Sequence, residues 1–294
     1  APLGTNLDQT RSELAMRLPL KSYRFKPLAD WPAFIGRAGV VDFANRRARI
    51  DFQKSKFGGL FINRAVAWQP SEYSSQINIR GDLAGDASTA IQILDAAGVK
   101  PDALGSQIAL EGRLKGDVRL EIPIGQSPEG SVFVEAQDLS VTWENLNEPI
   151  TQVNGRAEYR LNDGFYSDVL TGRLGGDPVE ARITVLDGET DITGKGRIQS
   201  FNLSKVAQIG LTEKQLFGSG EWSFTASVRD GLSLLSLETD GLGIGTALPY
   251  PFNKDPDTIG RIKITLSSEP GGSSLAVKLF EKTEIRGIRK TSSS

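Results

Sequence analysis

The sequence predicts an all-β protein with a minor helical component, built as one elongated and curved antiparallel sheet. Three observations carry this prediction: apolar and polar residues alternate over many short runs, glycine-rich turns separate the runs, and helical patterns are confined to two stretches. Alternation with a period of two is typical of a strand that has one buried face and one solvated face.

The alternation is strict along six runs of the chain. In residues 112–122, for example, Leu114, Val118 and Leu120 share one side, and Arg119 lies with its charged neighbours on the other. Each such run predicts a strand with one apolar and one polar face. The runs that predict strands are 76–83, 112–122, 153–161, 179–185, 222–228 and 262–266.

Turn and helix signals divide the chain between these strands. Residues 87–97 are rich in helix formers, follow a capping residue at Asp86 and end before Gly98, which predicts a short helix. A weaker helical pattern covers 203–217. Tight turns are predicted at Asn162-Asp163-Gly164, Gly175-Gly176-Asp177-Pro178, Asp187-Gly188 and Arg229-Asp230-Gly231.

A triplet of glycine, a charged residue and an apolar residue recurs along the chain, and two interpretations of it stay open. Glycine marks the start of a strand in any β protein, or hairpin-scale units stack along one axis into an elongated sheet. In both cases we expect the glycine to open a strand. The triplets begin at Gly81, Gly112, Gly155, Gly172, Gly196, Gly220 and Gly260.

The composition excludes much of enzyme chemistry. The chain of 294 residues has neither histidine nor cysteine, so it cannot build a Ser-His-Asp or Cys-His catalytic site, a disulfide or a cysteine zinc site. Its net charge of −2 argues against a protein that binds nucleic acid through the phosphates. No window approaches the roughly 18 apolar residues of a membrane-spanning helix. We therefore expect no catalytic residue, no metal and no cofactor.

One face of the predicted sheet carries a large amount of apolar side chain, and two architectures would use it. In a sandwich, this face meets a second sheet and is ordinary core, as in a structural or stalk domain. In an open trough, the same face lines a groove that lipid fills. A third hypothesis is a carbohydrate-active enzyme that uses carboxylates, but only scattered Asp and Glu residues support it.

Several segments resemble the YhdP-type AsmA-like family. Trp31-Pro32 leads into Val40–Phe43 and Phe57–Leu60, in the order of the family. The most distinctive stretch is Leu237–Leu242, which precedes the L-P-x-P-x-x-K segment Leu248–Lys254. Further similar segments are Leu110–Leu114, Leu120–Pro123 and Val153–Ala157, so that the resemblance covers roughly residues 23–280.

The resemblance implies a bridge-like lipid transfer protein of Gram-negative bacteria. Such proteins are anchored in the inner membrane, cross the periplasm and carry phospholipid towards the outer membrane. We then expect residues 1–294 to form a single segment of an open, U-shaped groove with an apolar concave face, with a soft division near 125–130 and a polar tail at 289–294. The expected partners are phospholipid acyl chains, the other segments of a longer protein with their membrane anchor, and envelope proteins. The resemblance carries over no catalytic residue.

Period two assigns every residue of a strand to one face of the sheet, and a slip of one residue would invert the assignment. Arg119, Glu158 and Arg182 are expected to face water. The residues expected to line the lipid path are Ile79, Leu83, Leu114, Val118, Leu120, Ala157, Tyr159, Ile183, Trp222, Phe224, Ile262 and Ile264.

Overall fold

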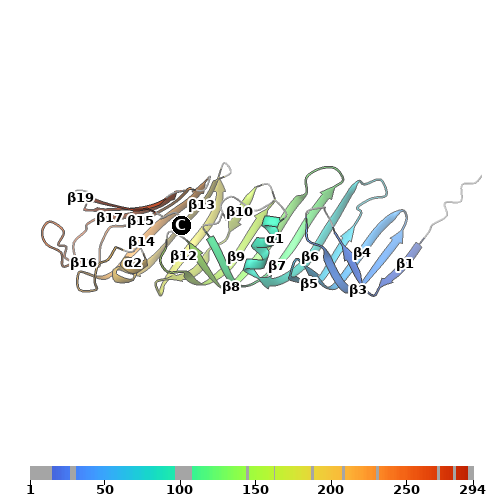
Figure 1. Cartoon of the computed structure of the whole chain (residues 1–294), viewed down its shortest axis with the longest axis horizontal. Helices are drawn as coiled ribbons and strands as arrows, with labels where there is room; N and C mark the ends of the chain where they lie inside the picture. Colours follow the sequence, from blue (N-terminus) through green and yellow to red (C-terminus); the bar gives the residue numbers. More distant parts are fainter. Residues whose placement is uncertain are drawn as a thin grey trace, which may run out of the picture.

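A computed structural model shows an elongated molecule made of one long open sheet (Figure 1). The structure describes residues 15–26, 31–96, 108–143, 146–161, 163–186, 189–206, 209–229, 232–269, 272–280 and 283–290. Within these ranges it contains nineteen strands and two short helices, which confirms the predicted all-β class with minor helix.

All the strand pairs of the sheet are antiparallel. The strands are β1 (Ala15–Leu20), β2 (Tyr23–Phe25), β3 (Phe34–Ala44), β4 (Arg47–Phe57), β5 (Leu60–Trp68), β6 (Gln76–Asp86), β7 (Ile108–Pro123), β8 (Glu129–Trp143), β9 (Ile150–Arg160), β10 (Gly164–Ser167), β11 (Leu170–Leu174), β12 (Asp177–Leu186), β13 (Glu189–Gln199), β14 (Leu216–Arg229), β15 (Leu232–Thr239), β16 (Ile244–Thr246), β17 (Ile262–Glu269), β18 (Gly272–Leu279) and β19 (Thr283–Lys290). The helices are α1 (Ala87–Ala96) and α2 (Ser200–Val206).

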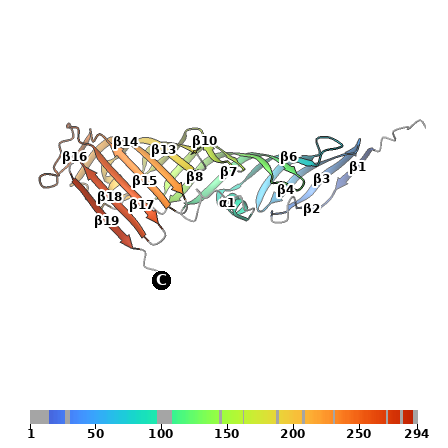
Figure 2. The ribbon, with the colours of Figure 1, turned by 90° about the horizontal axis from the view of Figure 1, so that it is seen from above.

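The sheet is a meander, in which most strands pair with the strands before and after them in the sequence. This holds from β3 to β9 and from β11 to β15. In two places a pair of short strands shares one neighbour: β1 and β2 on β3, and β10 and β11 on β9. Among the described strands, β1 and β19 pair on one side only, so the sheet is not closed. Figure 2 shows the strands following one another along the long axis.

The six runs predicted as strands all lie in strands, apart from Leu161, which directly follows β9. The predicted turn at Gly175-Gly176 joins β11 to β12. β19 includes Arg289 and Lys290 of the expected polar tail. Some predicted features fall outside the described residues: Asn162, Asp187-Gly188, Asp230-Gly231, Ala97 and residues 291–294.

The recurring glycines do not open strands as predicted. Only Gly260 precedes a strand, and the other six lie inside strands. Gly112 and Gly155 have φ angles of 112° and 141°, and the pairing shifts register beside each of them. A Cβ on Gly196 would lie 2.7 Å from the carbonyl oxygen of Pro178 on the neighbouring strand. These glycines permit bulges and close backbone approach within strands, which is why the prediction was wrong.

The first predicted helix is confirmed as α1, but the second is wrong in its extent. α2 ends at Val206, and β14 already begins at Leu216. Gly210 between them has a φ of 76°, outside the range of a right-handed helix. Thr212 and Gln215 then form a turn, in which the Gln215 side chain accepts two hydrogen bonds from Thr212. The apolar pattern beyond Val206 therefore reflects packing of a loop against the core.

The two helices occupy equivalent places in the sheet. α1 comes two strands after the glycine turn that begins at Gly58, and α2 comes two strands after the turn that begins at Gly175. Each helix packs back onto its turn: a Cβ on Gly58 would lie 2.6 Å from Cγ1 of Ile93, and one on Gly175 would lie 3.1 Å from Cβ of Asn202. The chain thus repeats a unit of turn, two strands and helix, which is larger than a hairpin.

The apolar side chains form two adjoining clusters along the sheet. Ile150 of β9 packs against both of them, so the apolar interior is continuous from β2 to β18. Members of the N-terminal cluster include Phe34, Phe52, Ile62, Ile79, Leu114, Leu120 and Tyr159, and members of the C-terminal cluster include Trp143, Ile198, Leu203, Trp222, Leu237, Ile264 and Val277.

Candidate functional site

Cross-strand registers place the expected lining residues on one face of the sheet, which we call the inner face. Ile79 of β6 lies opposite Leu120 of β7. Phe224 of β14 lies opposite Leu237 of β15, which in turn lies opposite Ile264 of β17. Side chains that face each other in this way contact their neighbours on the next strand. The inner face therefore carries apolar rows that run across the strands.

The structure buries most of the twelve expected lining residues. Val118, Ala157, Ile183 and Phe224 are half-buried, and Ala157 and Ile183 belong to neither apolar cluster. The remaining side chains are each at most 9% exposed, because residues of the inner face and of the helices pack against one another. The buried residues are Ile79, Leu83, Leu114, Leu120, Tyr159, Trp222, Ile262 and Ile264.

An aromatic group at the N-terminal end of the inner face is missing from the predicted lining. Phe34 stacks on Phe57 and on Phe52, with ring centroids 4.5 and 5.6 Å apart. Irregular positions conceal the alternation there. The pairing of β3 with β4 leaves out Arg37 and Lys54 together without a change of register, and Lys54 has a φ of 50°, whereas the pairing of β5 with β6 shifts register at Asn63. A search that allows one inserted residue per strand would find these runs.

Two apolar cavities lie at the inner face of the sheet. Each has a volume of about 130 Å³. The first lies beneath α1 and is lined by Ala90, Trp31 and Tyr159 among others. The second is lined by residues that include Ile183 and Phe224. An apolar cavity of ~150 Å³ stays dry and binds a hydrocarbon such as benzene, so both cavities are of a size and character that suit hydrocarbon.

Two indole groups of the C-terminal cluster are buried donors without an acceptor among the described residues. Trp143 is 5% exposed and Trp222 is 3% exposed, and neither Nε1 has a hydrogen-bond partner there. A buried donor without a partner costs about 1–3 kcal/mol. Trp143 also lines the second cavity, so its ring borders the space that a ligand would enter.

One charged side chain, Lys254, is buried in the part of the chain that the structure describes. Its Nζ donates to the carbonyl oxygens of Gly241, Ile244 and Asp255, over 2.7, 2.8 and 3.0 Å. Burial lowers the pKa of this ammonium, while the negative charge of Asp255 and of Asp240 acts in the opposite direction. Lys254 is the lysine of the L-P-x-P-x-x-K segment, and its contacts give that lysine a structural role.

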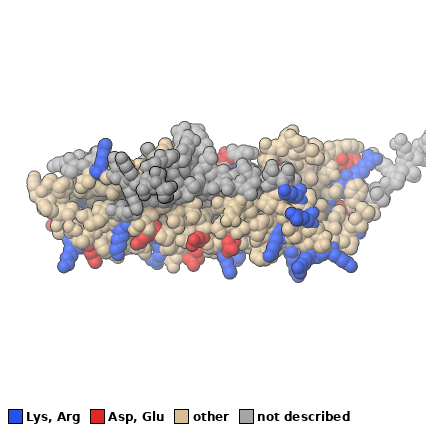
Figure 3. All heavy atoms as spheres, viewed as in Figure 1, with Lys and Arg blue, Asp and Glu red and all other residues tan. Residues whose placement is uncertain are grey.

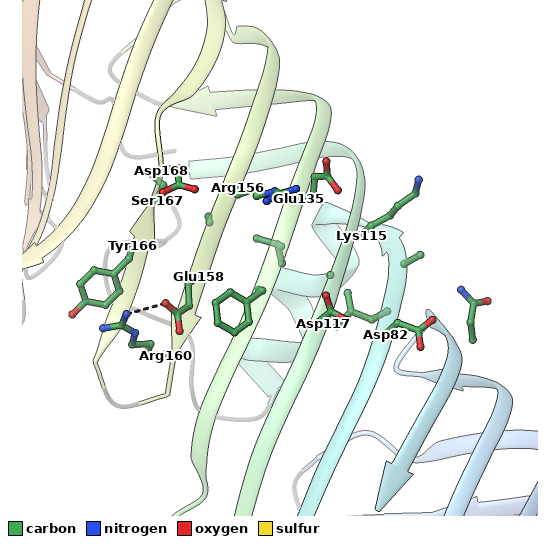
Figure 4. A pocket seen from close by; sticks show the side chains of 17 residues that line it. Asp82, Lys115, Asp117, Glu135, Arg156, Glu158, Arg160, Tyr166, Ser167 and Asp168 are labelled. Carbon is green, nitrogen blue, oxygen red and sulfur yellow. Dashed lines mark hydrogen bonds and ion pairs between the residues drawn. The ribbon is translucent and has the colours of Figure 1, made fainter.

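The opposite face of the sheet, which we call the outer face, carries many charged side chains over β6 to β10, where it is hollowed (Figure 4). The hollow has a volume of about 850 Å³. Lys115 lies opposite Glu135 on the next strand, which lies opposite Arg156, and Arg160 pairs with Glu158 over 2.9 Å. Within the described ranges, no three acidic side chains are grouped to hold a metal ion. The hollow is thus a solvated surface of alternating charge.

The residues expected to face water lie on the outer face. Arg119 and Arg182 are exposed, and Glu158 is half-buried beside Arg160. None of the described helices is both long and apolar enough to cross a membrane.

Comparison with known proteins gives one match. A family model described as YhdP protein matches residues 2–293, which is nearly the whole chain. The comparison with curated proteins and the comparison with solved structures found no match.

Proposed function

The chain belongs to the YhdP family, and from this membership and the apolar inner face we propose that it carries phospholipid along its sheet. The acyl chains follow the inner face, and the head groups stay in water at the open side of the trough. Transport takes place in the periplasm of a Gram-negative bacterium, between the inner and outer membranes. The chain acts there as one segment of a longer, membrane-anchored protein, and we assign it no catalytic step.

The continuity of the inner face is the observation that carries this proposal. The N-terminal and C-terminal clusters share Ile150, so no polar layer interrupts the apolar path among the described residues. An ordinary ligand pocket would be bounded at both ends, whereas this surface extends along the length of the sheet. Such a surface suits a ligand that moves rather than one that stays.

The energetics of lipid transfer explain why a continuous apolar path is useful. Exposing two acyl chains to water costs ~0.8 kcal/mol per CH₂, in total on the order of 20–25 kcal/mol. A path of neighbouring, nearly equivalent apolar sites replaces this single barrier by a series of small ones. The mechanism needs no titrating or nucleophilic side chain, which agrees with a chain that has no histidine and no cysteine.

The packing of the inner face adds a condition to the mechanism. Most lining side chains are already buried against one another, so an acyl chain must displace some of these contacts as it passes. The half-buried residues Val118, Ile183 and Phe224 border the two apolar cavities and are the places where this displacement begins. Hydrocarbon then replaces side chain at little net cost, because both are apolar.

The unpartnered indole groups support a ligand that brings a hydrogen-bond acceptor. Trp143 and Trp222 hold N–H donors inside the C-terminal cluster. A phospholipid has ester carbonyl oxygens at the head of each acyl chain, and such an oxygen would accept a hydrogen bond from Trp143 at the second cavity. A pure hydrocarbon would leave the donor without a partner.

Native mass spectrometry of the protein purified without detergent tests the proposal. We expect adducts whose masses correspond to phospholipids, and we expect their release when the protein is unfolded. The rival interpretation is a structural envelope domain whose apolar face is ordinary core. A protein that carries no lipid after purification, and takes up none from vesicles, would support that rival.

A further inference from the structure

The positive charge of the chain is concentrated at its N-terminal end. Residues 15–68 contain eleven Lys and Arg against three Asp, a net charge of +8. The rest of the chain contains 23 Lys and Arg against 33 Asp and Glu, a net charge of −10. Figure 3 shows Lys and Arg gathered on the surface over these strands, whereas blue and red alternate farther along. A nearly neutral chain thus has one strongly basic end.

Five of these cations form what we call the basic patch. Two others at this end are neutralised, since Arg17 lies 3.6 Å from Asp42 and Arg49 lies 3.0 Å from Asp51. The five are exposed, and in the described part of the chain none of them takes part in an ion pair. The basic patch consists of Arg24, Arg37, Lys54, Lys56 and Arg64.

Exposed apolar side chains lie within the basic patch. The registers of β2 to β5 place Arg24, Ile35, Lys56 and Phe61 in one row across the outer face. Ile35 is 52% exposed and Phe61 is 55% exposed. The ammonium of Lys56 lies 4.9 Å from the centre of the Phe61 ring, which keeps the two side chains together. Cations and apolar groups therefore alternate along this row.

From this juxtaposition we propose that the outer face of β2 to β5 is a docking surface for an anionic lipid bilayer. The five cations bind the phosphates of the lipid head groups, and Ile35 and Phe61 enter the boundary between head groups and acyl chains. Unpaired cations explain a preference for an anionic partner. We take a bilayer as the occupant because exposed Ile35 and Phe61 beside the cations give the surface the mixed apolar and basic character of interfacial membrane binding. The surface lies on the face opposite to the apolar interior, so the proposal does not rest on lipid transport.

Binding of the full chain to vesicles tests this inference. We use vesicles of phosphatidylcholine alone and of phosphatidylcholine mixed with phosphatidylglycerol, and we measure the bound fraction by co-sedimentation. We expect binding to the anionic vesicles only. Raising the ionic strength to about 1 M, where the Debye length is ~3 Å, should release the protein. Equal binding to both kinds of vesicle, or binding to neither, would overturn the proposal.

Matched variants locate the surface. Lys56→Glu combined with Arg64→Glu should weaken binding to anionic vesicles at least tenfold, since each basic residue near such a surface contributes about fivefold. Arg182→Glu combined with Lys214→Glu makes the same change in net charge at exposed positions outside the patch, and it should change binding less than about twofold. Equal losses in the two double variants would show that only the net charge matters, and the patch would then have no role.

A variant of Phe61 distinguishes binding to a bilayer from binding to an acidic protein. Phe61→Ser should weaken binding to anionic vesicles by about threefold or more, because it removes an inserted ring. Polyglutamate serves as the rival ligand. If the chain binds polyglutamate as tightly as vesicles and Phe61→Ser binds like the parent, the surface takes an acidic protein instead. The inner-face variant Phe224→Asp should bind vesicles normally, so that a failure of lipid transport and a failure of docking are distinguishable.

Discussion

The ammonium of Lys254 donates a hydrogen bond to the carbonyl oxygen of Gly241, 2.7 Å away, and so joins the two sides of the loop between β15 and β17. Gly241 has a φ of 78°, which favours glycine at this position. The loop carries β16, whose Ile244 is fully buried in the C-terminal cluster. A charged side chain thus holds part of the apolar interior in place.

Removing this ammonium should destabilise the protein. Lys254→Met should lower the free energy of unfolding by about 2–4 kcal/mol, because three carbonyl oxygens lose a charged donor. Lys263→Met on the exposed side of β17 is the control and should change it by less than about 0.5 kcal/mol. Urea denaturation followed by circular dichroism measures both. Equal effects of the two substitutions would contradict the assigned role.

A methyl group added to the inner face at Gly194 should also destabilise the fold. Its Cβ would meet the ring of Phe224 and the carbonyl oxygen of Glu180, and the latter belongs to the backbone and cannot move aside. We expect Gly194→Ala to lower the free energy of unfolding by about 1–3 kcal/mol. Gly287→Ala on β19 is the matched control, because no heavy atom lies within 4 Å of its added Cβ. A loss confined to Gly287→Ala would refute this description of the packing.

Tyr159 should make stability depend on pH in the alkaline range. Burial raises the pKa of its phenol above the ordinary value of about 10. Below that value both states of the chain are protonated and the stability is fully present. At a pH between the two pKa values, the phenol is ionised only in the unfolded state, which therefore binds fewer protons than the folded state. Stability is lost as the pH rises through the higher pKa of the folded state. The free energy of unfolding, measured by denaturation below and above about pH 10, should fall less in Tyr159→Phe than in the parent protein. Tyr250→Phe, at a position 89% exposed, should leave the loss unchanged.

A charge placed in the first apolar cavity should interfere with lipid uptake. Val118 is half-buried and lines this cavity, and its neighbour Arg119 is exposed on the outer face. Val118→Asp should reduce the lipid that co-purifies by at least about tenfold, because an unpaired carboxylate beside an acyl chain costs several kcal/mol. Arg119→Glu should have little effect. The readout is lipid per protein by mass spectrometry, for variants whose circular dichroism matches that of the parent. Unchanged loading in Val118→Asp would mean that lipid does not reach this cavity.

The strands with uninterrupted alternation are the ones that could be predicted from sequence. In β6 and β7, period two alone places Ile79 and Leu120 on the inner face, and the register brings them opposite each other. β3 to β5 cannot be assigned in this way, because the alternation of buried residues shifts by one position within the strand, as between Phe52 and Ser55 of β4 and between Ile62 and Ala65 of β5. The recurring glycines give a wrong prediction for a related reason, since strand starts and bulges both favour glycine.

Features that depend on distant parts of the chain could not be predicted. The burial of Lys254 follows from the fold of a loop whose carbonyl groups converge on it, and its own neighbours in the sequence are ordinary turn residues. The end of α2 at Val206 is not marked in the sequence, and Gly210, whose φ is 76°, is a residue that a helix could also have held at moderate cost. The packing of the inner-face side chains also depends on the curvature of the sheet. The alternation of apolar and polar residues along a strand does not specify that curvature.

Site-specific photo-crosslinking at Phe224 tests the central claim most directly. A benzophenone amino acid at position 224 sits at the second apolar cavity, and the same group at Thr225 points to the exposed outer face one residue away. After incubation with phospholipid vesicles and irradiation, we predict a lipid adduct at position 224 and none at position 225. Absence of lipid at position 224, or equal capture at both positions, would contradict the claim that acyl chains travel along the inner face.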